Sequence, residues 1–335
     1  LVELPAAAAT AAAGRELMLA RIAHELFWLG RNLGRAEHTA RMLDGVFHAD
    51  LQGRPDDPGG ITLSWDSLLA IMGSSVPSGG TASRDVTLAA LTHDQSNVNS
   101  VASCVTRART GARALRDVIS AEMWEAINTF HLELGDQRVS SGPYAFVSYV
   151  KARCALFWGV AARTMLRDEA HAFLDAGGRF ESADMVLRML RVALPPAGVT
   201  ENGESSPTRD GQALALLQAV GGFQAYRRAV PAPPNAAPVA SFLLFRLSYP
   251  DSVAASINAA RYALSVADGN PRASEPVLRL SRLLADLEFR GRIAGDGGEL
   301  IEACEIVGRE LALADQDIAE RYFGGAQSTD ALLRR

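Results

Sequence analysis

The chain has 335 residues, of which 48% are hydrophobic and 21% are charged, which is enough for one large helical core or for two domains. Its net charge is −5 and no sustained basic stripe occurs, which argues against nucleic acid or an anionic membrane as the main partner. No apolar run reaches about 18 residues, the length that a transmembrane helix needs, so no membrane span is expected.

The cysteines and the first residues indicate the compartment. Cys104, Cys154 and Cys304 are odd in number, widely spaced and set in apolar patterns, which is typical of reduced, buried residues in a cytosolic protein. The alanine run at 6–13 lacks the charged leader of a signal peptide. We therefore expect a cytoplasmic protein. The chain opens with Leu1, and residues 1–17 resemble a linker or the tail of a fused upstream domain.

Nearly all of the chain is predicted to be helical, because Ala, Leu and Arg dominate and alternating β-branched residues are scarce. In residues 18–166 the pattern, the caps and the turn residues predict helices at 18–50, 65–72, 83–92, 98–118, 120–134 and 143–166, with loops at 52–60 and 74–80. In residues 167–323 they predict helices at 168–194, 212–220, 250–266, 274–292 and 299–323, with a polar loop at 197–211, a proline-rich connector at 231–238 and a break at 295–298. Residues 324–335 are predicted to be a flexible tail.

The first helix carries an apolar stripe whose spacing alternates between four and three residues. Its members are Ile22, Leu26, Leu29, Leu33, Ala36, Ala40, Leu43 and Phe47. Glu37 and Arg41 lie on the shoulder of this stripe in the favourable order for an intrahelical ion pair. Gly30 and Gly34 share that shoulder and would allow another backbone to come close. Arg31 and Arg35 point away from the stripe, so they would need partners if that face is also buried.

A degraded copy of this helix returns 147 residues later. GRNLGRAEHTARML, from Gly30, overlies GGRFESADMVLRML, from Gly177, without a gap, so the Glu37–Arg41 pair corresponds to Asp184 and Arg188. A second block follows in the same order, because LTHDQSNVNSV at 91–101 resembles LSYPDSVAASI at 247–257. Two matched blocks in one order indicate duplication of a unit of about 150 residues. We therefore predict an all-α fold in which a duplicated helical bundle forms one body from two pseudo-symmetric halves, 18–166 and 167–323.

Three motifs resemble those of the alpha-E family, a helical domain named for a Glu-Arg dipeptide. FWLGRNLGRAEHTARMLD resembles its opening signature, usually close to YWLGRYLERAENTARLLD, and GRFESADMVLRML resembles its second copy, usually close to GRFLERADMTLRLL. ALRDVISAEMWEAIN resembles a block between them and contains Trp124 and Asn128. The likeness covers most of residues 18–323.

The dipeptide is incomplete in both copies of this chain. It is Gly34-Arg35 in the first copy and Glu181-Ser182 in the second. If one Glu and one Arg suffice, Glu181 and Arg35 would complement each other across a pseudo-two-fold axis. If instead the second copy has lost one residue, Arg179 would correspond to Arg31.

The resemblance implies a context more than a reaction. Alpha-E proteins are encoded beside, or fused to, circularly permuted ATP-grasp ligases, often with transglutaminase-like proteins. This implies a role in ATP-dependent synthesis or modification of peptides or amides, with ATP and Mg on the partner ligase and no cofactor in this chain. The start at Leu1 fits the C-terminal half of such a fusion.

Other chemistry has weak support in the sequence. Asp168 and His171 have the i,i+3 spacing of di-iron bundles, but no second such pair exists, so no metal site is predicted. No nucleophile elbow, P-loop or dinucleotide-binding fingerprint occurs.

What remains is a set of arginines and carboxylates on core helices, with Trp124 and Asn128 as further candidates. Arginine forks bind carboxylate or phosphate through two parallel bonds, so this set could bind an acidic or peptide substrate. The alternative is an ion-pair lattice that fixes the register of the helices. The charged candidates are Arg31, Arg35, Glu37, Arg41, Asp44, Arg179, Glu181, Asp184 and Arg188.

Three functions stay open at this point. The chain could be an accessory or catalytic component of an ATP-grasp system, a non-catalytic helical module that docks or dimerises the ligase, or a free-standing hydrolase or transferase.

Overall fold

One long helix, α1 (Ala6–Leu51), runs through the middle of the molecule and organises the other helices. The computed structural model of the chain describes residues 6–51, 64–74, 82–137, 143–193, 207–293 and 297–324. Within these ranges the secondary structure is α-helical apart from one 3-10 turn, Pro271–Ala273, and contains no strand, so the all-α prediction is confirmed. The helix starts at Ala6 and therefore includes most of the segment that we predicted as a linker.

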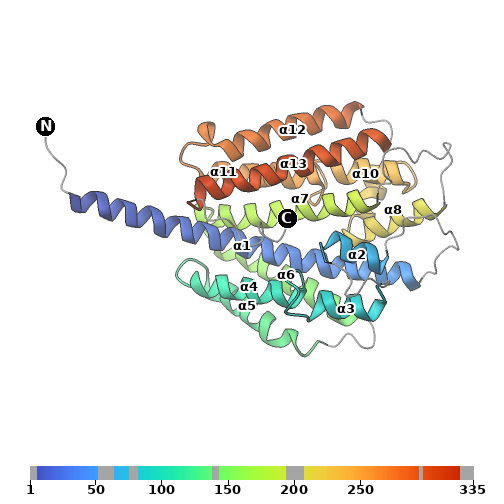
Figure 1. The fold of residues 1–335 in the computed structure, drawn as a ribbon, viewed down its shortest axis with the longest axis horizontal. Helices are drawn as coiled ribbons and strands as arrows, with labels where there is room; N and C mark the ends of the chain where they lie inside the picture. The colour runs from blue at the N-terminus through green and yellow to red at the C-terminus, as the bar shows by residue number, and fades with distance from the viewer. Residues whose placement is uncertain are drawn as a thin grey trace.

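The first half of the chain builds a four-helix bundle on α1. Helices α4 (Val101–Ala114) and α6 (Tyr144–Thr164) pack against α1, and α5 (Ala121–Leu134) closes the ring by packing against both of them. Two short helices, α2 (Trp65–Ile71) and α3 (Arg84–Thr92), lie near the C-terminal end of α1. Figure 1 shows this bundle as the lower layer.

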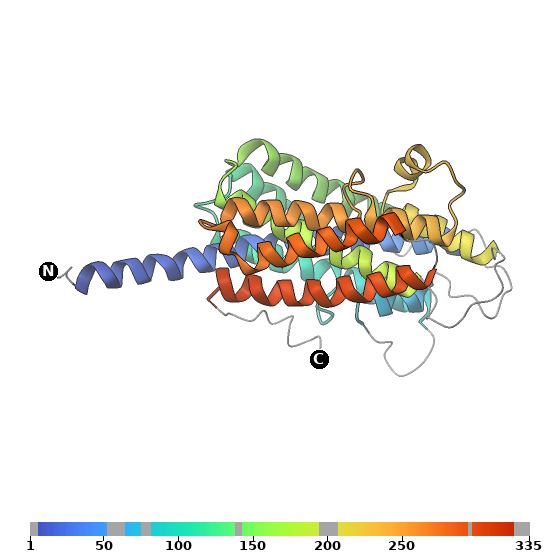
Figure 2. The same cartoon turned by 90° about the horizontal axis from the view of Figure 1, so that it is seen from above.

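The second half builds a bundle of the same order on α7 (Glu169–Ala193). Helices α11 (Val253–Ala267) and α13 (Gly297–Tyr322) pack against α7, and α12 (Glu275–Ile293) packs against both. Figure 2, in which the molecule is seen from above, shows α12 and α13 side by side in front of α1. Three shorter helices, which pack near one end of this bundle, are α8 (Pro207–Ala219), α9 (Phe223–Ala229) and α10 (Ala236–Phe245).

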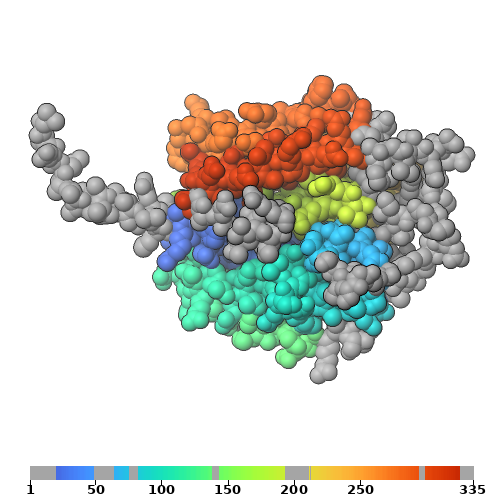
Figure 3. Space-filling view, in the orientation of Figure 1, coloured from blue at the N-terminus to red at the C-terminus, as the bar shows by residue number. Residues whose placement is uncertain are grey.

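The two bundles meet where α1 and α7 pack against each other and run in the same direction. We call this contact the crossing. A Cβ atom placed on Gly30 would lie 2.2 Å from the carbonyl oxygen of Leu174, and one placed on Gly177 would lie 1.9 Å from that of Phe27. Only glycine fits at either position, since real Cβ atoms do not approach backbone so closely. In the space-filling view α1 and α7 lie between the upper and lower layers (Figure 3). The predicted close approach at Gly30 is therefore confirmed.

Most predicted boundaries lie within a few residues of the observed ones. Ser83, Ser100, Ser120 and Ser252 each cap a helix by accepting a hydrogen bond from a backbone N–H in the first turn. Three differences stand out. Helix α8 begins at Pro207, inside the predicted loop, and α10 begins at Ala236, inside the predicted connector, and was not predicted as a helix. Helix α9 was not predicted either, because its seven residues have no capping side chain. The loop at 52–60, the tail at 325–335 and most of the loops at 74–80 and 197–206 lie outside the described residues.

Among the described helices, α6 alone is long and apolar enough to cross a membrane by length and composition. One such helix is weak evidence for a span, because core helices of soluble proteins pass the same test. Its buried side, which includes Phe146, Cys154 and Phe157, packs inside the first bundle.

Candidate functional site

A buried carboxylate lies between the two spine helices. Glu181 of α7 is fully buried, and its two oxygens accept hydrogen bonds from Arg31 and Arg35 of α1. The Nε atoms of these arginines lie 2.8 Å and 2.6 Å from the Glu181 oxygens, and a second Arg35 nitrogen lies 3.1 Å from one of them. We call Arg31, Arg35 and Glu181 the Arg–Glu core. The expected pairing of Glu181 with Arg35 across the two helices is confirmed.

The Arg–Glu core carries two positive charges and one negative charge, and Asp315 of α13 supplies a second negative charge beside Arg31. Burial acts to raise the pKa of Glu181, but the charges of Arg35 and Arg31 outweigh it and hold that pKa well below its ordinary value of 4.5. Burial acts to lower the pKa of Arg31, but Asp315 and Glu181 outweigh it and the pKa is raised. The carboxylate of Glu181 therefore stays ionised and the guanidinium of Arg31 stays charged across the physiological range.

The remaining polar atoms of the two arginines also have partners. Arg31 donates to Asp315 of α13 at 2.7 Å, and its guanidinium lies 5.0 Å from the ring of Trp28. Arg35 donates to the side-chain oxygen of Asn99 at 3.2 Å, and Asn99 in turn donates to the Met72 carbonyl oxygen. The Arg–Glu core is thus an ion-pair network that holds α1, α7 and α13 in register. Its predicted role in substrate binding stays a prediction.

A cavity of about 460 Å³ lies between α1, α6 and α7, beside the same crossing. We call it the crossing pocket. Three predicted site residues line it, namely Glu37, Arg41 and Arg179. Its other lining residues are Gly34, His38, Trp158, Ala161, Ala162, Arg167, His171, Leu174, Asp175, Gly178, Ser182 and Asp251.

Charged pairs lie along the wall of the crossing pocket. Arg41 donates to Glu37 at 2.7 Å and 3.0 Å, as the spacing predicts. Burial acts to lower the pKa of Arg41, but Glu37, with a smaller contribution from Asp251, outweighs it and raises the pKa. Arg179 lies 3.5 Å from Asp175, so it does not join the Arg–Glu core.

His38 carries an unsatisfied polar atom in the wall of the pocket. The residue is only 4% exposed, and its Nε2 lies 3.2 Å from the hydroxyl of Ser182. Its Nδ1 is buried and has no hydrogen-bond partner in the described part of the protein. A buried polar atom without a hydrogen-bond partner is costly, so the position of His38 lowers the stability of the fold.

The other predicted site residues lie in separate places. Asp44 pairs with Lys151 of α6 at 2.9 Å. Asp184 pairs with Arg188 at 2.9 Å on α7, and it also lies 3.9 Å from Arg31 at the edge of the Arg–Glu core.

Trp124 and Asn128 lie on α5, which packs against α4 and α6 rather than against the spine helices. Asn128 accepts a hydrogen bond from Arg109 at 2.9 Å, and the guanidinium of Arg116 lies 5.2 Å from the Trp124 ring. Their binding role stays a prediction, and the structure does not bring them to the crossing.

Sequence reasoning missed several residues that contact or line these sites. Asn99 and Asp251 lie in the two blocks that resemble each other, so their places before Ser100 and Ser252 were an available signal. Asp315 and Trp158 gave no such signal. They lie on α13 and α6, and no local sequence pattern predicts which side of these helices faces α1 and α7. The Asp168–His171 spacing has a local explanation, since Asp168 accepts hydrogen bonds from the backbone N–H groups of Ala170 and His171 at the start of α7.

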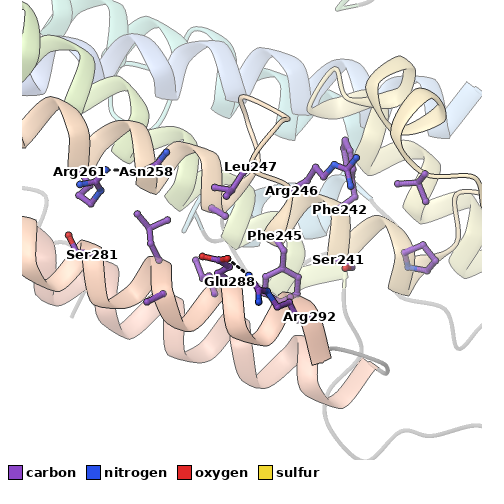
Figure 4. Close-up of a pocket in the computed structure, with 17 residues that line it drawn as sticks. Ser241, Phe242, Phe245, Arg246, Leu247, Asn258, Arg261, Ser281, Glu288 and Arg292 are labelled. Carbon is purple, nitrogen blue, oxygen red and sulfur yellow. Dashed lines mark hydrogen bonds and ion pairs between the residues drawn. The ribbon is translucent and has the colours of Figure 1, made fainter.

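A larger groove of about 700 Å³ lies on the second bundle, between α10, α11 and α12. Its floor is apolar, with Phe242, Phe245 and Leu247, and Arg246 and Arg261 stand at its edges (Figure 4). Leu247 is 54% exposed. We call this surface the α10–α12 groove.

Comparison with known proteins gives a family. Neither a curated protein nor a solved structure matches the chain. Residues 18–323 match one family model, alpha-E, described as a predicted alpha-helical domain with a conserved ER motif. The match includes both spine helices and therefore the Arg–Glu core. The chain belongs to the alpha-E family.

Proposed function

We propose that the chain is an accessory or catalytic component of an ATP-grasp-dependent system that synthesises or modifies peptides or amides, and that its peptide substrate binds in the crossing pocket. A circularly permuted ATP-grasp ligase, fused or separate, would bind the ATP and Mg. A transglutaminase-like protein is a further expected partner, and we expect the assembly in the cytoplasm.

One observation carries this proposal: three of the predicted substrate-binding residues line a single cavity. Glu37, Arg41 and Arg179 come from two helices that are far apart in sequence, and they share the pocket with Trp158 and His38. Aromatic and charged groups in one concave site are typical of ligand pockets. The Arg–Glu core would then have a supporting role, since it positions α1 and α7 on either side of the pocket.

The test is product formation by the partner ligase with variants of this chain. Arg41→Gln and Arg179→Gln remove a charge from half-exposed side chains, so the fold should survive. We expect each to lower product formation about tenfold or more, because a charge-assisted contact to substrate contributes about 1.5–3 kcal/mol. Arg282→Gln, an exposed arginine of α12 that lines neither cavity, is the matched control. Full activity of both folded pocket variants would rule the proposal out.

We also infer that the two bundles are copies of one unit related by a pseudo-two-fold axis along the crossing. The Gly30–Leu174 and Gly177–Phe27 contacts exchange when 147 is added to the residue number, as an isologous contact requires. Gly34 also faces Glu181, its own counterpart at that offset. Between α4 and α11 the capping serines, Ser100 and Ser252, give an offset of 152, which is four residues less than the 156 that separates the blocks at 91–101 and 247–257.

A second function has its own support. The α10–α12 groove is apolar, has arginines at its edges and carries exposed Leu247, as a docking surface for a partner would. In this alternative the chain is a non-catalytic module that docks or dimerises the ligase. Leu247→Asp would then abolish co-purification with the ligase, whereas the pocket variants would leave both co-purification and product formation intact.

A further inference from the structure

The crossing pocket occupies the space that corresponds to the Arg–Glu core on the other side of the pseudo-two-fold axis. The counterparts of Glu181, Arg31 and Arg35 at the offset of 147 are Gly34, Gly178 and Ser182, and all three line the pocket. Two arginines and a glutamate are thus replaced by two glycines and a serine. The pocket is open where these three large side chains fill the counterpart.

Most charges around the pocket cancel in pairs. Glu37 pairs with Arg41 at 2.7 Å, and Asp175 pairs with Arg179 at 3.5 Å. One acid and one base remain, Asp251 and Arg167.

Asp251 is the acid that remains. In the described part of the chain it forms no ion pair, although its charge contributes to the raised pKa of Arg41. It directly precedes the cap Ser252, as Asn99 directly precedes the cap Ser100. Because Asn99 accepts a hydrogen bond from Arg35, Asp251 is expected beside Ser182, the counterpart of Arg35.

Arg167 is the base that remains, and it lies near the other end of the pocket. It donates to the Ala162 carbonyl oxygen at 2.9 Å and contacts His171, and it forms no ion pair with an acid in the described residues. Burial, and then the charge of Arg167, lower the pKa of His171, so this ring is neutral at physiological pH. Arg167 therefore presents a positive charge at this end of the pocket that no ion pair in the described residues occupies.

The two unpaired charges are separated by the length of a short peptide. His171, beside Arg167, and Ser182, beside which we place Asp251, are 11 residues apart on α7. This corresponds to a rise of about 16 Å along a helix. An extended chain rises about 3.3–3.6 Å per residue, so three to five residues with an ion-pair contact at each end span that distance.

We propose that the crossing pocket binds a short peptide of about three to five residues with free termini, with its ammonium group on Asp251 and its carboxylate on Arg167. The peptide would pass Trp158, an aromatic side chain of the pocket wall. This inference rests on the proposed function for the identity of the site, and it gives the substrate a length, a charge pattern and a direction.

The test is calorimetric titration of the full chain with matched peptides. The probe is Ala-Phe-Phe-Ala with free termini, compared with its N-acetylated form, its C-amidated form and the dipeptide Ala-Phe. We expect the free tetrapeptide to bind, each blocked form to bind about tenfold more weakly or worse, and the dipeptide to show no binding at the same concentrations.

Two variants assign the ends of the peptide. Asp251→Asn should make binding insensitive to N-acetylation but not to C-amidation, and Arg167→Gln should do the reverse. Asp117→Asn and Arg282→Gln, matched changes at residues that line neither cavity, should retain both sensitivities. The inference is overturned if the free tetrapeptide does not bind, if blocked and free forms bind equally, or if both pocket variants behave like the controls.

The peptide titration and the ligase assay can fail independently, so the two proposals are tested separately. If free peptides bind in this pattern but Arg41→Gln and Arg179→Gln leave the ligase product unchanged, the pocket binds peptides and the ligase-linked function is wrong. If the product is lost in those variants without any preference for free termini, the ligase-linked function stands and the peptide end contacts are wrong.

Discussion

At the scale of single residues, the buried carboxylate of Glu181 is the interaction on which the two spine helices depend most. Its partners were partly predictable, because each copy of the family motif keeps one half of the Glu-Arg dipeptide and the halves complement each other. Asp315 was not predictable, since only the packing of α13 brings it to Arg31. His38 was not predictable either, because its significance depends on the partner that its ring nitrogen lacks.

Replacing Glu181 with Gln should strongly destabilise the fold. The change leaves two buried guanidinium groups facing a neutral amide, and removing one partner of a buried ion pair costs about 3–5 kcal/mol. Glu37→Gln is the matched control, because its i,i+4 pair is partly exposed and contributes about 0.3–0.5 kcal/mol. Urea denaturation at neutral pH measures both. Equal free energies of unfolding for the two variants would contradict a central role for the Arg–Glu core.

The same residue makes stability depend on pH. The pKa of Glu181 is lower in the folded chain than its ordinary value of 4.5, so its contribution is present above that value and is lost as the pH falls below it. We expect the free energy of unfolding of the natural chain to fall more steeply between about pH 5 and pH 3 than that of Glu181→Gln. Parallel curves for the two proteins would show that the carboxylate has no such depressed pKa.

At the scale of elements, the crossing of α1 and α7 positions both the Arg–Glu core and the crossing pocket. The helices themselves were predictable from capping serines and apolar spacing, and the close approach from the paired glycines. The short α9 was not, because seven residues without a capping side chain give no signal. The pocket was not predictable as a cavity, because it arises where small side chains leave space rather than from any motif.

Adding one methyl group should have opposite effects on stability at the crossing and at an exposed glycine elsewhere in the fold. Gly30→Ala places a carbon 2.2 Å from the Leu174 carbonyl oxygen, so the helices must move apart at a cost of about 1–3 kcal/mol or more. Gly159→Ala, an exposed glycine in α6 with nothing within 4 Å of its added Cβ, should instead stabilise the chain by about 0.5–1 kcal/mol. Thermal denaturation reports both signs. A neutral Gly30→Ala variant would contradict the close backbone contact.

At the scale of the whole molecule, two bundles share one interface that is filled with charge on one side and hollow on the other. Membership of the alpha-E family and the all-helical class were both predictable from the sequence and are confirmed. The sequence also pointed to two halves, and the reciprocal glycine contacts support that prediction. The difference between the sides depends on the small residues Gly34, Gly178 and Ser182, whose joint effect appears only when α1 and α7 are placed together.

A crystal structure of the full chain with Ala-Phe-Phe-Ala tests the central claim most directly, because it locates the peptide and both of its ends. The account predicts peptide density between α1, α6 and α7, with the amino terminus at Asp251 and the carboxylate at Arg167, while the Arg–Glu core remains unchanged. Density in the α10–α12 groove with an empty crossing pocket, or a peptide that displaces Glu181 from its arginines, would contradict it.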